Sequence, residues 1–410
     1  MPSKQFGSGS SAGAIISIHT LTEQIVVIYE DLSVGTYKLT KSSGRISLLI
    51  KPDKLRALGS RRLSLSTLAV AGRLSTDEPQ EIAHYRAKVL ARQLEHGTVR
   101  AKEPAWNSCF GVTIGGLIKE TLLRKSAASG TRSVEGSAIM DSAFSLISCA
   151  YNDGTIKMHS IDGLRLKCST SGGHRGAILC LEIGSCGALM VTGGEDATCR
   201  VWVVDYPDLA FALTDAYVQT ELGNFDEGGQ KQLLTCCHVL WGHLAPVECL
   251  SFNSDLDIVV SGSAGGRLCL HKARNGKFIR TMSVCNIGKP SSIRILKLCY
   301  TGCFVAYSES QSLHLCTVNG VELYCAETTD ALNALQISSD GQMLISGGEK
   351  CEVVVRSMKN LQVISVLDLK RHGPIRCLAL TSSENNPSSQ LLCVGSNDGI
   401  MTVVDVDHSY

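Results

Sequence analysis

Residues 172–205 read GGHRGAILCLEIGSCGALMVTGGEDATCRVWVVD and show the local pattern of this chain most clearly. It contains three short apolar runs, AILCLEI, ALMVTGG and CRVWVVD, which are separated by the polar turns GSCG and EDAT. Short alternating runs between Gly and Asp turns are typical of an antiparallel meander, whereas a βαβ unit would need a helical pattern between strands. The stretch therefore predicts a small up-and-down β-sheet.

The same order of strands and turns recurs along the chain. The further copies are 14–39, 144–170, 242–283, 292–327, 330–367 and 373–406. Their aligned turn positions are Asp153, Asp196, Gly265, Ser310, Lys350 and Asp398. All gaps but one are near the period of about 40–45 residues that is typical of propeller blades; the gap from Asp196 to Gly265 is longer because it contains the polar segment 206–235. The units alternate rather than show the spacing of helical repeats. We therefore predict an all-β propeller of seven blades over residues 14–406.

Segments outside the repeats form the termini and insertions of this plan. Residues 1–13 are rich in Gly and Ser, so we expect a flexible N-terminus rather than a strand that closes the ring, and 407–410 form a short tail. The expected insertions are 41–105, 118–142 and 206–235. The second has the Ser, Gly and Ala content of a mobile loop, and the third is polar.

The first insertion combines a basic tract with a predicted helix. Residues 41–73 carry eight basic side chains against the single acid Asp53, which favours a solvated loop over contact with anionic lipid or an acidic partner. Ser64 follows Arg61-Arg62-Leu63 and is a candidate phosphorylation site. Residues 77–96 have helix-start signals and an apolar stripe, which favours a helix packed on the propeller over a partner-binding helix.

Composition excludes several classes of protein. The 39 Lys and Arg residues nearly balance 38 Asp and Glu residues, so nucleic acid is not expected as a partner. The 18 cysteines include no Cys-x-x-Cys pair, and most lie in apolar runs, so we expect neither a metal, nor a cofactor, nor a disulfide framework. Many free thiols and a polar N-terminus without signal-peptide character indicate a cytoplasmic protein.

At this point the residues resemble the WD40 repeat. His174, Thr192, Asp196 and Trp202 match the four positions that form a hydrogen-bonded network within one blade of that family. The next unit keeps His243 and Ser261 but has other residues at the Asp and Trp positions, while Asp153 and Asp398 occupy the Asp position elsewhere. A buried Asp needs hydrogen-bond donors, and the His and Thr supply them. The resemblance assigns these residues a structural role.

A closer resemblance covers most of 106–406. Segments such as LISCAYNDGTIKMHSIDGLRL and GALMVTGGEDATCRVWVVD are similar to the C-terminal propeller of the BEACH-domain proteins, the neurobeachin and beige-like group. Those proteins are large scaffolds of vesicle trafficking, lysosome-related organelles and autophagy. The resemblance implies that this chain is the tail of such a scaffold, that PH-like and BEACH domains of the same parent are partners, and that it lies peripherally on endomembranes.

Function is therefore expected to be binding rather than catalysis. The turn Asp and loop His residues recur at equivalent positions of different blades, and the motifs of hydrolases and phosphate-binding enzymes are missing, so no catalytic residue is assigned. Partner proteins should meet turn residues next to these positions, namely Arg175, Glu195, Leu244, Asn152 and Asn397. One alternative is an independent WD40 adaptor such as a substrate receptor of a ubiquitin ligase, and another is a propeller hydrolase with acids or histidines converging at its centre.

Overall fold

The computed structural model describes fifteen segments of the chain. They are residues 3–7, 13–20, 24–29, 33–40, 45–54, 106–113, 146–151, 154–160, 166–170, 173–184, 189–204, 234–286, 289–369, 373–381 and 389–407. All regular elements in these segments are β-strands, which confirms the all-β prediction. The same segments contain no helix with the length and hydrophobicity needed to cross a membrane.

Six blades consist of four strands each that are consecutive in the sequence. They are β2 (Ile15–Thr20), β3 (Gln24–Tyr29), β4 (Ser33–Thr40) and β5 (Arg45–Lys54); β6 (Trp106–Thr113), β7 (Leu146–Tyr151), β8 (Ile156–Ser160) and β9 (Leu166–Ser169); β10 (Ile178–Ile183), β11 (Leu189–Gly194), β12 (Cys199–Val204) and β13 (Leu234–Leu240). The others are β14 (Val247–Asn253), β15 (Ile258–Ser263), β16 (Arg267–Lys272) and β17 (Phe278–Ser283); β20 (Ile293–Leu298), β21 (Cys303–Ser308), β22 (Ser312–Thr317) and β23 (Glu322–Glu327); β24 (Leu332–Ile337), β25 (Met343–Gly348), β26 (Glu352–Ser357) and β27 (Val363–Asp368). A short hairpin of β18 (Cys285–Asn286) and β19 (Lys289–Pro290) follows β17.

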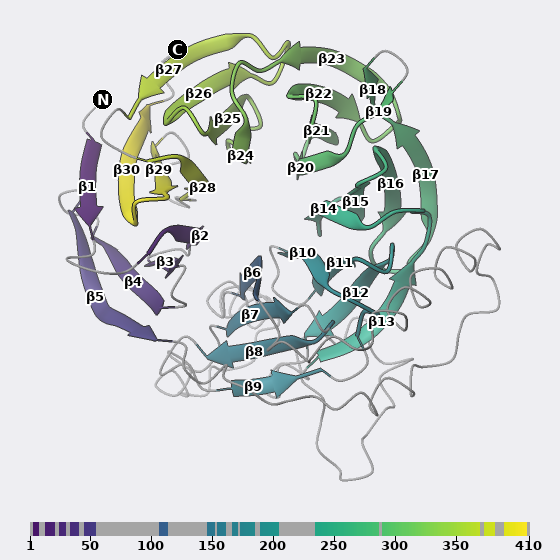
Figure 1. The fold of residues 1–410 in the computed structure, drawn as a ribbon, viewed down its shortest axis with the longest axis horizontal. Coiled ribbons are helices and arrows are strands. Elements are labelled where there is room, and N and C mark those ends of the chain that lie inside the picture. Colours follow the sequence, from purple (N-terminus) through teal and green to yellow (C-terminus); the bar gives the residue numbers. More distant parts are fainter. Residues whose placement is uncertain are drawn as a thin grey trace, which may run out of the picture.

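A further four-stranded sheet closes the ring from both ends of the chain. β28 (Ile375–Leu380), β29 (Ser389–Ser396) and β30 (Ile400–Asp407) form three of its strands, and β1 (Ser3–Gly7) pairs antiparallel with β30. Figure 1 shows this sheet in its place in the ring, with the first strand of each blade innermost and the last strand on the rim. The prediction of seven blades is therefore corrected: six blades are continuous in the sequence, and the last repeat supplies only three strands of a composite sheet that β1 completes.

Two boundary predictions were wrong for a related reason. Ser3–Gly7 forms β1 although it lies in the expected flexible N-terminus, because an open sheet edge offers unpaired N–H and C=O groups that almost any segment can satisfy. Arg45–Lys54 forms β5 on the edge of the first blade, so this blade extends into the predicted insertion 41–105. The helix predicted at 77–96 lies outside the described residues, as do most of the 118–142 and 206–235 insertions.

The core lies between neighbouring blades. Val191 and Val201 of one blade pack in a single buried cluster with Val247 and Phe252 of the next, and similar clusters join the later blades. The closing sheet packs on the first blade through Cys393 and Ile15, both fully buried. Each fully buried aliphatic side chain contributes about 1.5–3 kcal/mol relative to exposure, so the interfaces between blades hold the ring together.

A bulge recurs at the same place in the inner strands of six sheets. The register shifts between Ile178 and Cys180 in β10, and the same shift recurs in β2, β14, β20, β24 and β28. Opposite Cys180 lies Gly193, where an added Cβ would come within 2.7 Å of Val247 in the next blade. The thiol fills the space beside the glycine, and its hydrogen points to the Val247 carbonyl at 3.6 Å. Cys180 is thus a packing residue at the contact between two blades.

Candidate interaction face

The four WD40-type residues of the third blade meet in a continuous hydrogen-bonded chain. Trp202 Nε1 on β12 donates to Thr192 Oγ1 on β11 over 2.9 Å, and the Thr192 hydroxyl lies 2.8 Å from His174 Nε2. His174 Nδ1 lies 2.9 Å from Asp196 Oδ1 in the turn after β11. Every donor has an acceptor if the Thr192 hydroxyl donates to Nε2 and His174 Nδ1–H donates to the carboxylate. The chain connects the loop before β10 to the turn and to two strands.

Asp196 is the acceptor at the end of this chain. Besides His174, the Arg175 amide donates to its carboxylate over 3.0 Å and the Thr198 hydroxyl over 2.7 Å. Burial alone would raise the pKa of Asp196, but the hydrogen bonds from His174, the Arg175 amide and Thr198 outweigh burial and hold the pKa below its usual range. The carboxylate therefore stays ionised and fixes the loop 173–177 against the turn.

The fourth blade keeps half of this arrangement. His243 Nε2 lies 2.7 Å from Ser261 Oγ, and His271, at the Trp position, donates from Nε2 to the Trp241 carbonyl over 2.8 Å. With Gly265 at the Asp position, no carboxylate of the described residues bonds to His243, and burial lowers the pKa of His243 to about 3, with the charges of His271 and Arg267 adding to the effect. This histidine is therefore neutral, and its role is to fill buried space and to hydrogen-bond Ser261.

One backbone hydrogen bond fixes the loops of one face in five described sheets. The first or second residue of the turn between the second and third strands donates its N–H to the carbonyl of a residue just before the inner strand. The pairs are Glu195 to Ala177, Ala264 to Pro246, Glu309 to Ser292, Glu349 to Ala331 and Asn397 to Pro374. We call the surface made by these turns and loops the loop face. Its backbone is held rigidly while its side chains differ from blade to blade.

Four of the five predicted contact residues lie on the loop face. Glu195 and Asn397 are exposed, while Arg175 and Leu244 are half-buried. Asn397 Oδ1 accepts from Arg376 Nε over 3.0 Å, and Glu195 Oε2 accepts from the Ala177 amide over 3.3 Å. The fifth, Asn152, lies outside the described residues.

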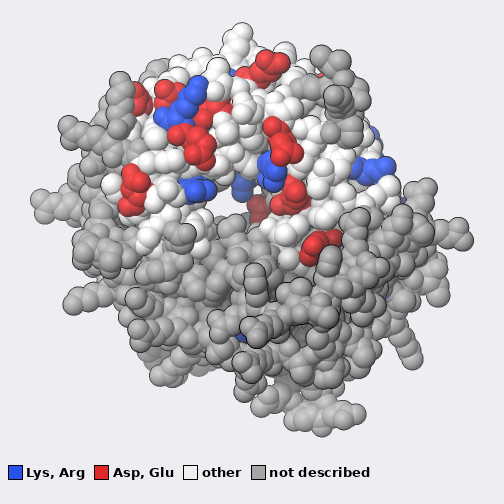
Figure 2. Space-filling view, viewed as in Figure 1, with Lys and Arg blue, Asp and Glu red and all other residues white. Residues whose placement is uncertain are grey.

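Sequence reasoning missed the basic partners of these turns. Arg294 at the start of β20 is half exposed, donates to Glu309 over 2.6 Å and lies 3.6 Å from Glu248. Arg376 takes the corresponding place at the start of β28. The sequence signal that could have identified these arginines is their position in the strand, because each is the second residue of an inner strand. The loop face thus carries both signs of charge, and Figure 2 shows acidic and basic side chains interspersed on one face of the ring.

The inner strands also bring charged groups toward the centre of the ring. Lys297 Nζ on β20 lies 3.8 Å from Glu182 Oε1 on β10, across the blade between them, and Glu182 Oε2 accepts from the Phe252 amide over 2.8 Å. Burial raises the pKa of Glu182 against the opposing effect of Lys297, and burial lowers the pKa of His19 on β2 to about 4, with Lys297 contributing. Glu182, Lys297 and His19 thus approach one another near the centre, but the Glu182 carboxylate is already paired with Lys297 and with the Phe252 amide.

Several predicted residues and segments cannot be placed. Asp153, Ser64 and the basic tract 41–73 apart from β5 lie outside the described residues. Asp398 is described and exposed, and its carboxylate accepts from the Gly373 amide, as Asp196 does from Arg175. Among the described residues, one group of potential metal ligands lies close together, on β22 and β23.

Comparison with known proteins agrees with this geometry. The model of the neurobeachin β-propeller domain family matches residues 90–410. BEACH domain-containing protein B of Arabidopsis thaliana is 29% identical over 248 residues, which cover 57% of this chain and 8% of that protein. BEACH domain-containing protein lvsE of Dictyostelium discoideum is 24% identical over 276 residues, covering 64% of this chain and 11% of that protein. Mitochondrial division protein 1 of Vanderwaltozyma polyspora is 25% identical over 154 residues, 37% of this chain and 20% of that protein. The chain therefore spans only about a tenth of the length of the two BEACH relatives.

Proposed function

Because this chain belongs to the neurobeachin β-propeller family, we propose that it is a protein-interaction module of a BEACH-type scaffold in vesicle and membrane trafficking. The observation that carries the proposal is the loop face. The same backbone hydrogen bond fixes its turns in successive blades, whereas their side chains change from Glu195 to Ala264 to Asn397. A rigid frame with variable tips is how a binding protein gains specificity without losing stability.

Catalysis is not part of the proposal. The Glu182 carboxylate at the ring centre is occupied by Lys297 and by the Phe252 amide, which leaves it poorly suited to abstract a proton from a substrate. His174 and His243 are both buried and hydrogen-bonded within their own blades.

Partners and location extend the proposal. We propose that the partners are other proteins, including the PH-like and BEACH domains of the parent scaffold, and that the scaffold works in the cytoplasm, peripherally on endomembranes. The similarity to BEACH proteins supports this, and the basic tract 41–73 is the segment whose charge could meet anionic lipid. Association with liposomes containing anionic lipid, lost when Lys51, Lys54 and Arg56 are replaced by Gln, would support the membrane contact.

The experiment that tests the interaction module compares partner binding after a charge reversal on each of the two faces of the ring. The purified chain is used to capture partners from cytosol with and without added membranes, alongside Arg376→Glu on the loop face. Lys359→Glu, in the exposed turn between β26 and β27 on the opposite face, is the matched charge reversal. We expect Arg376→Glu to lose specific partners and Lys359→Glu to retain them, at equal thermal stability.

Two outcomes would overturn the proposal. If neither the unaltered chain nor Lys359→Glu captures a specific partner in either condition, the module has no binding role of this kind. If a component of a ubiquitin ligase is recovered in place of trafficking proteins, the alternative adaptor function is favoured instead.

A further inference from the structure

Three side chains of the fifth blade form a compact group outside the loop face. His314 lies on β22, and Glu322 and Cys325 lie on β23, the rim strand of that blade. Their ligand atoms all lie within 4.8 Å of one another. His314 is buried, whereas Glu322 and Cys325 are exposed, and His314 Nδ1 lies 2.8 Å from Glu322 Oε1. We call these three residues the rim cluster.

Strand register brings the rim cluster together. His314 and Cys325 are direct cross-strand partners in the antiparallel β22–β23 pair, and such partners have Cβ atoms about 4.5–5.5 Å apart. The register then shifts, so that Cys316 pairs with Glu322. Because one extra residue is taken up at this bulge, Glu322 returns to the same side of the sheet as Cys325. Nitrogen, sulfur and oxygen donors thus share one face.

The donor set identifies the ligand class. Imidazole, thiolate and carboxylate are the groups that bind Zn²⁺, at about 2.0–2.3 Å, which places tetrahedral donors roughly 3.3–3.8 Å apart. The two exposed side chains need to move by only about 1 Å to reach that spacing, while the buried His314 provides a fixed anchor. We propose that the rim cluster binds one zinc ion or a similar borderline divalent cation. On binding, the Cys325 S–H proton leaves to solvent, and the proton that His314 Nδ1 donates to Glu322 is exchanged for one on Nε2. The lone pairs of the sulfur and of Nδ1 then bond the cation, and the imidazole stays neutral.

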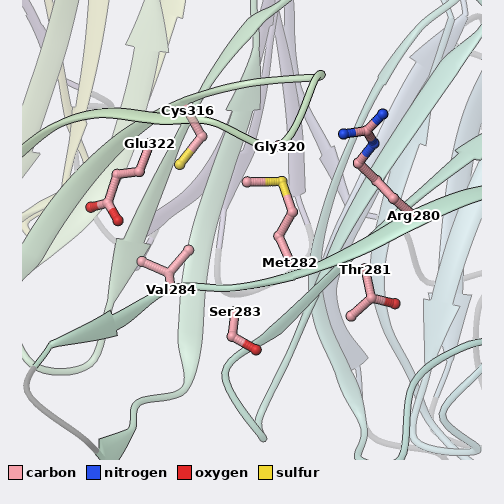
Figure 3. A pocket seen from close by; sticks show the side chains of 8 residues that line it. All are labelled: Arg280, Thr281, Met282, Ser283, Val284, Cys316, Gly320 and Glu322. Atoms are coloured by element: carbon pink, nitrogen blue, oxygen red, sulfur yellow. The ribbon is translucent and has the colours of Figure 1, made fainter.

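Glu322 of the rim cluster also lines a cavity, from which a further ligand could approach the cation. It has a volume of about 400 Å³, and Glu322 and Cys316 line it on one side while β17 residues Arg280, Thr281 and Met282 line it on the other. Figure 3 shows Glu322 and Cys316 next to each other on the wall of this cavity. Three protein ligands with a fourth position reached from a cavity leave room for water or for a ligand atom from a partner protein.

The position of the rim cluster explains what the cation would do. The fifth blade lacks the WD40-type network, since Ser310 stands at its aligned turn position. A cation would tie the exposed rim strand β23 to the buried β22. Since a ligand that binds only the folded state stabilises it by mass action, the proposal predicts a thermal midpoint that rises with metal concentration.

Metal binding can be measured directly on the full chain. The chain is freed of metal with a chelator, and Zn²⁺ binding is followed by competition with a chromogenic chelator. Co²⁺ is used in parallel because thiolate-to-cobalt absorption reports sulfur ligation. We expect one tight equivalent, a Co²⁺ thiolate band, and a higher thermal midpoint with metal. Cys325→Ser and Glu322→Gln, both at exposed positions, should weaken binding roughly 100-fold, the upper end of what even supporting residues of metal sites contribute.

Cys237→Ser is the matched control, since Cys237 is an exposed thiol on β13, the rim strand of another blade. It should retain the tight equivalent, the cobalt band and the metal-dependent midpoint. Equal affinity and an unchanged cobalt band in Cys325→Ser would overturn the proposal, as would the absence of any tight equivalent in the unaltered chain. The rim cluster would then be a hydrogen-bonded His–Glu pair next to a thiol.

Discussion

The described cysteines lie in contrasting environments. Cys199, Cys316 and Cys393 are buried, and burial raises the pKa of each thiol to about 12. Cys237 and Cys325 are exposed. Because the thiolate is the reactive form, a buried thiol with a raised pKa is both inaccessible and unreactive.

Thiol labelling should therefore divide the cysteines. We expect an alkylating reagent at pH 8 to modify Cys237 and, in the metal-free chain, Cys325 within minutes, and to modify Cys199 and Cys393 only after denaturation. Peptide mapping by mass spectrometry at successive times measures this. Fast labelling of Cys393 in the native chain would show that the interface between the closing sheet and the first blade opens readily.

His243 gives the stability a dependence on pH. Its pKa is about 3 in the folded chain and near 6.5 when unfolded, so the unfolded state binds more protons between these values. The stabilisation is complete above about pH 6.5 and is lost as the pH falls toward 3, by about 1.4 kcal/mol per pH unit at most. Urea unfolding between pH 7.5 and 5 should show a smaller slope for His243→Gln, which can still bond Ser261. Parallel curves for the two chains would contradict this assignment.

The turns between second and third strands share one strained position. Its occupants have positive φ in six described sheets: Gly154, Ala197, Gly266, Gln311, Cys351 and Gly399. Each directly follows an aligned turn position found in the sequence. Three of the six are not glycine, although left-handed backbone costs other residues about 1–2 kcal/mol.

Replacing Gln311 by Gly should therefore stabilise the chain. The exposed Gln311 has φ of +60°. Relief of about 1–2 kcal/mol of strain exceeds the 0.5–1 kcal/mol that the freer unfolded glycine costs, so we expect a net gain of about 0.5–1 kcal/mol in the free energy of unfolding. Gly399→Ala is the reverse substitution and should destabilise by a similar amount. Chemical denaturation measures both, and a loss of stability in Gln311→Gly would show that its turn is not strained.

Prediction from sequence succeeded where the pattern is local. The strands, glycines and turn Asp of 172–205 lie within one blade, and the hydrogen bonds of Asp196 follow from residues close in the chain. Residues 45–54 contain a period-two signal in Ile46, Leu48 and Ile50 that the basic charges obscured. The rim cluster was missed because neither the pairing of His314 with Cys325 nor the bulge before Glu322 can be read from spacing alone.

The whole ring depends on a contact between residues 400 positions apart. β1 pairs Ser3 with Val404 and Gly7 with Ile400, and so covers the edge that β30 would otherwise expose. A few backbone hydrogen bonds, each worth about 1 kcal/mol, hold this strand, and β1 becomes the rim strand of the closing sheet, in the place that the fourth strand takes in each other blade. No local pattern in this Gly- and Ser-rich segment predicts the pairing, because the pairing depends on where the chain places β30. Closure is in this sense a property of the whole molecule.

Removing residues 3–7 should therefore weaken and open the ring. We expect the free energy of unfolding to fall by roughly 2–4 kcal/mol, from the loss of a few hydrogen bonds and their cover. The uncovered β30 should also pair with other copies, so size-exclusion chromatography should show concentration-dependent oligomers. Gln5→Ala keeps the backbone pairing with Thr402 and is expected to behave as the unaltered chain. If the shortened chain is as stable and as monomeric as Gln5→Ala, the ring closes through the three strands β28–β30 alone, and β1 is only an accessory strand on its rim.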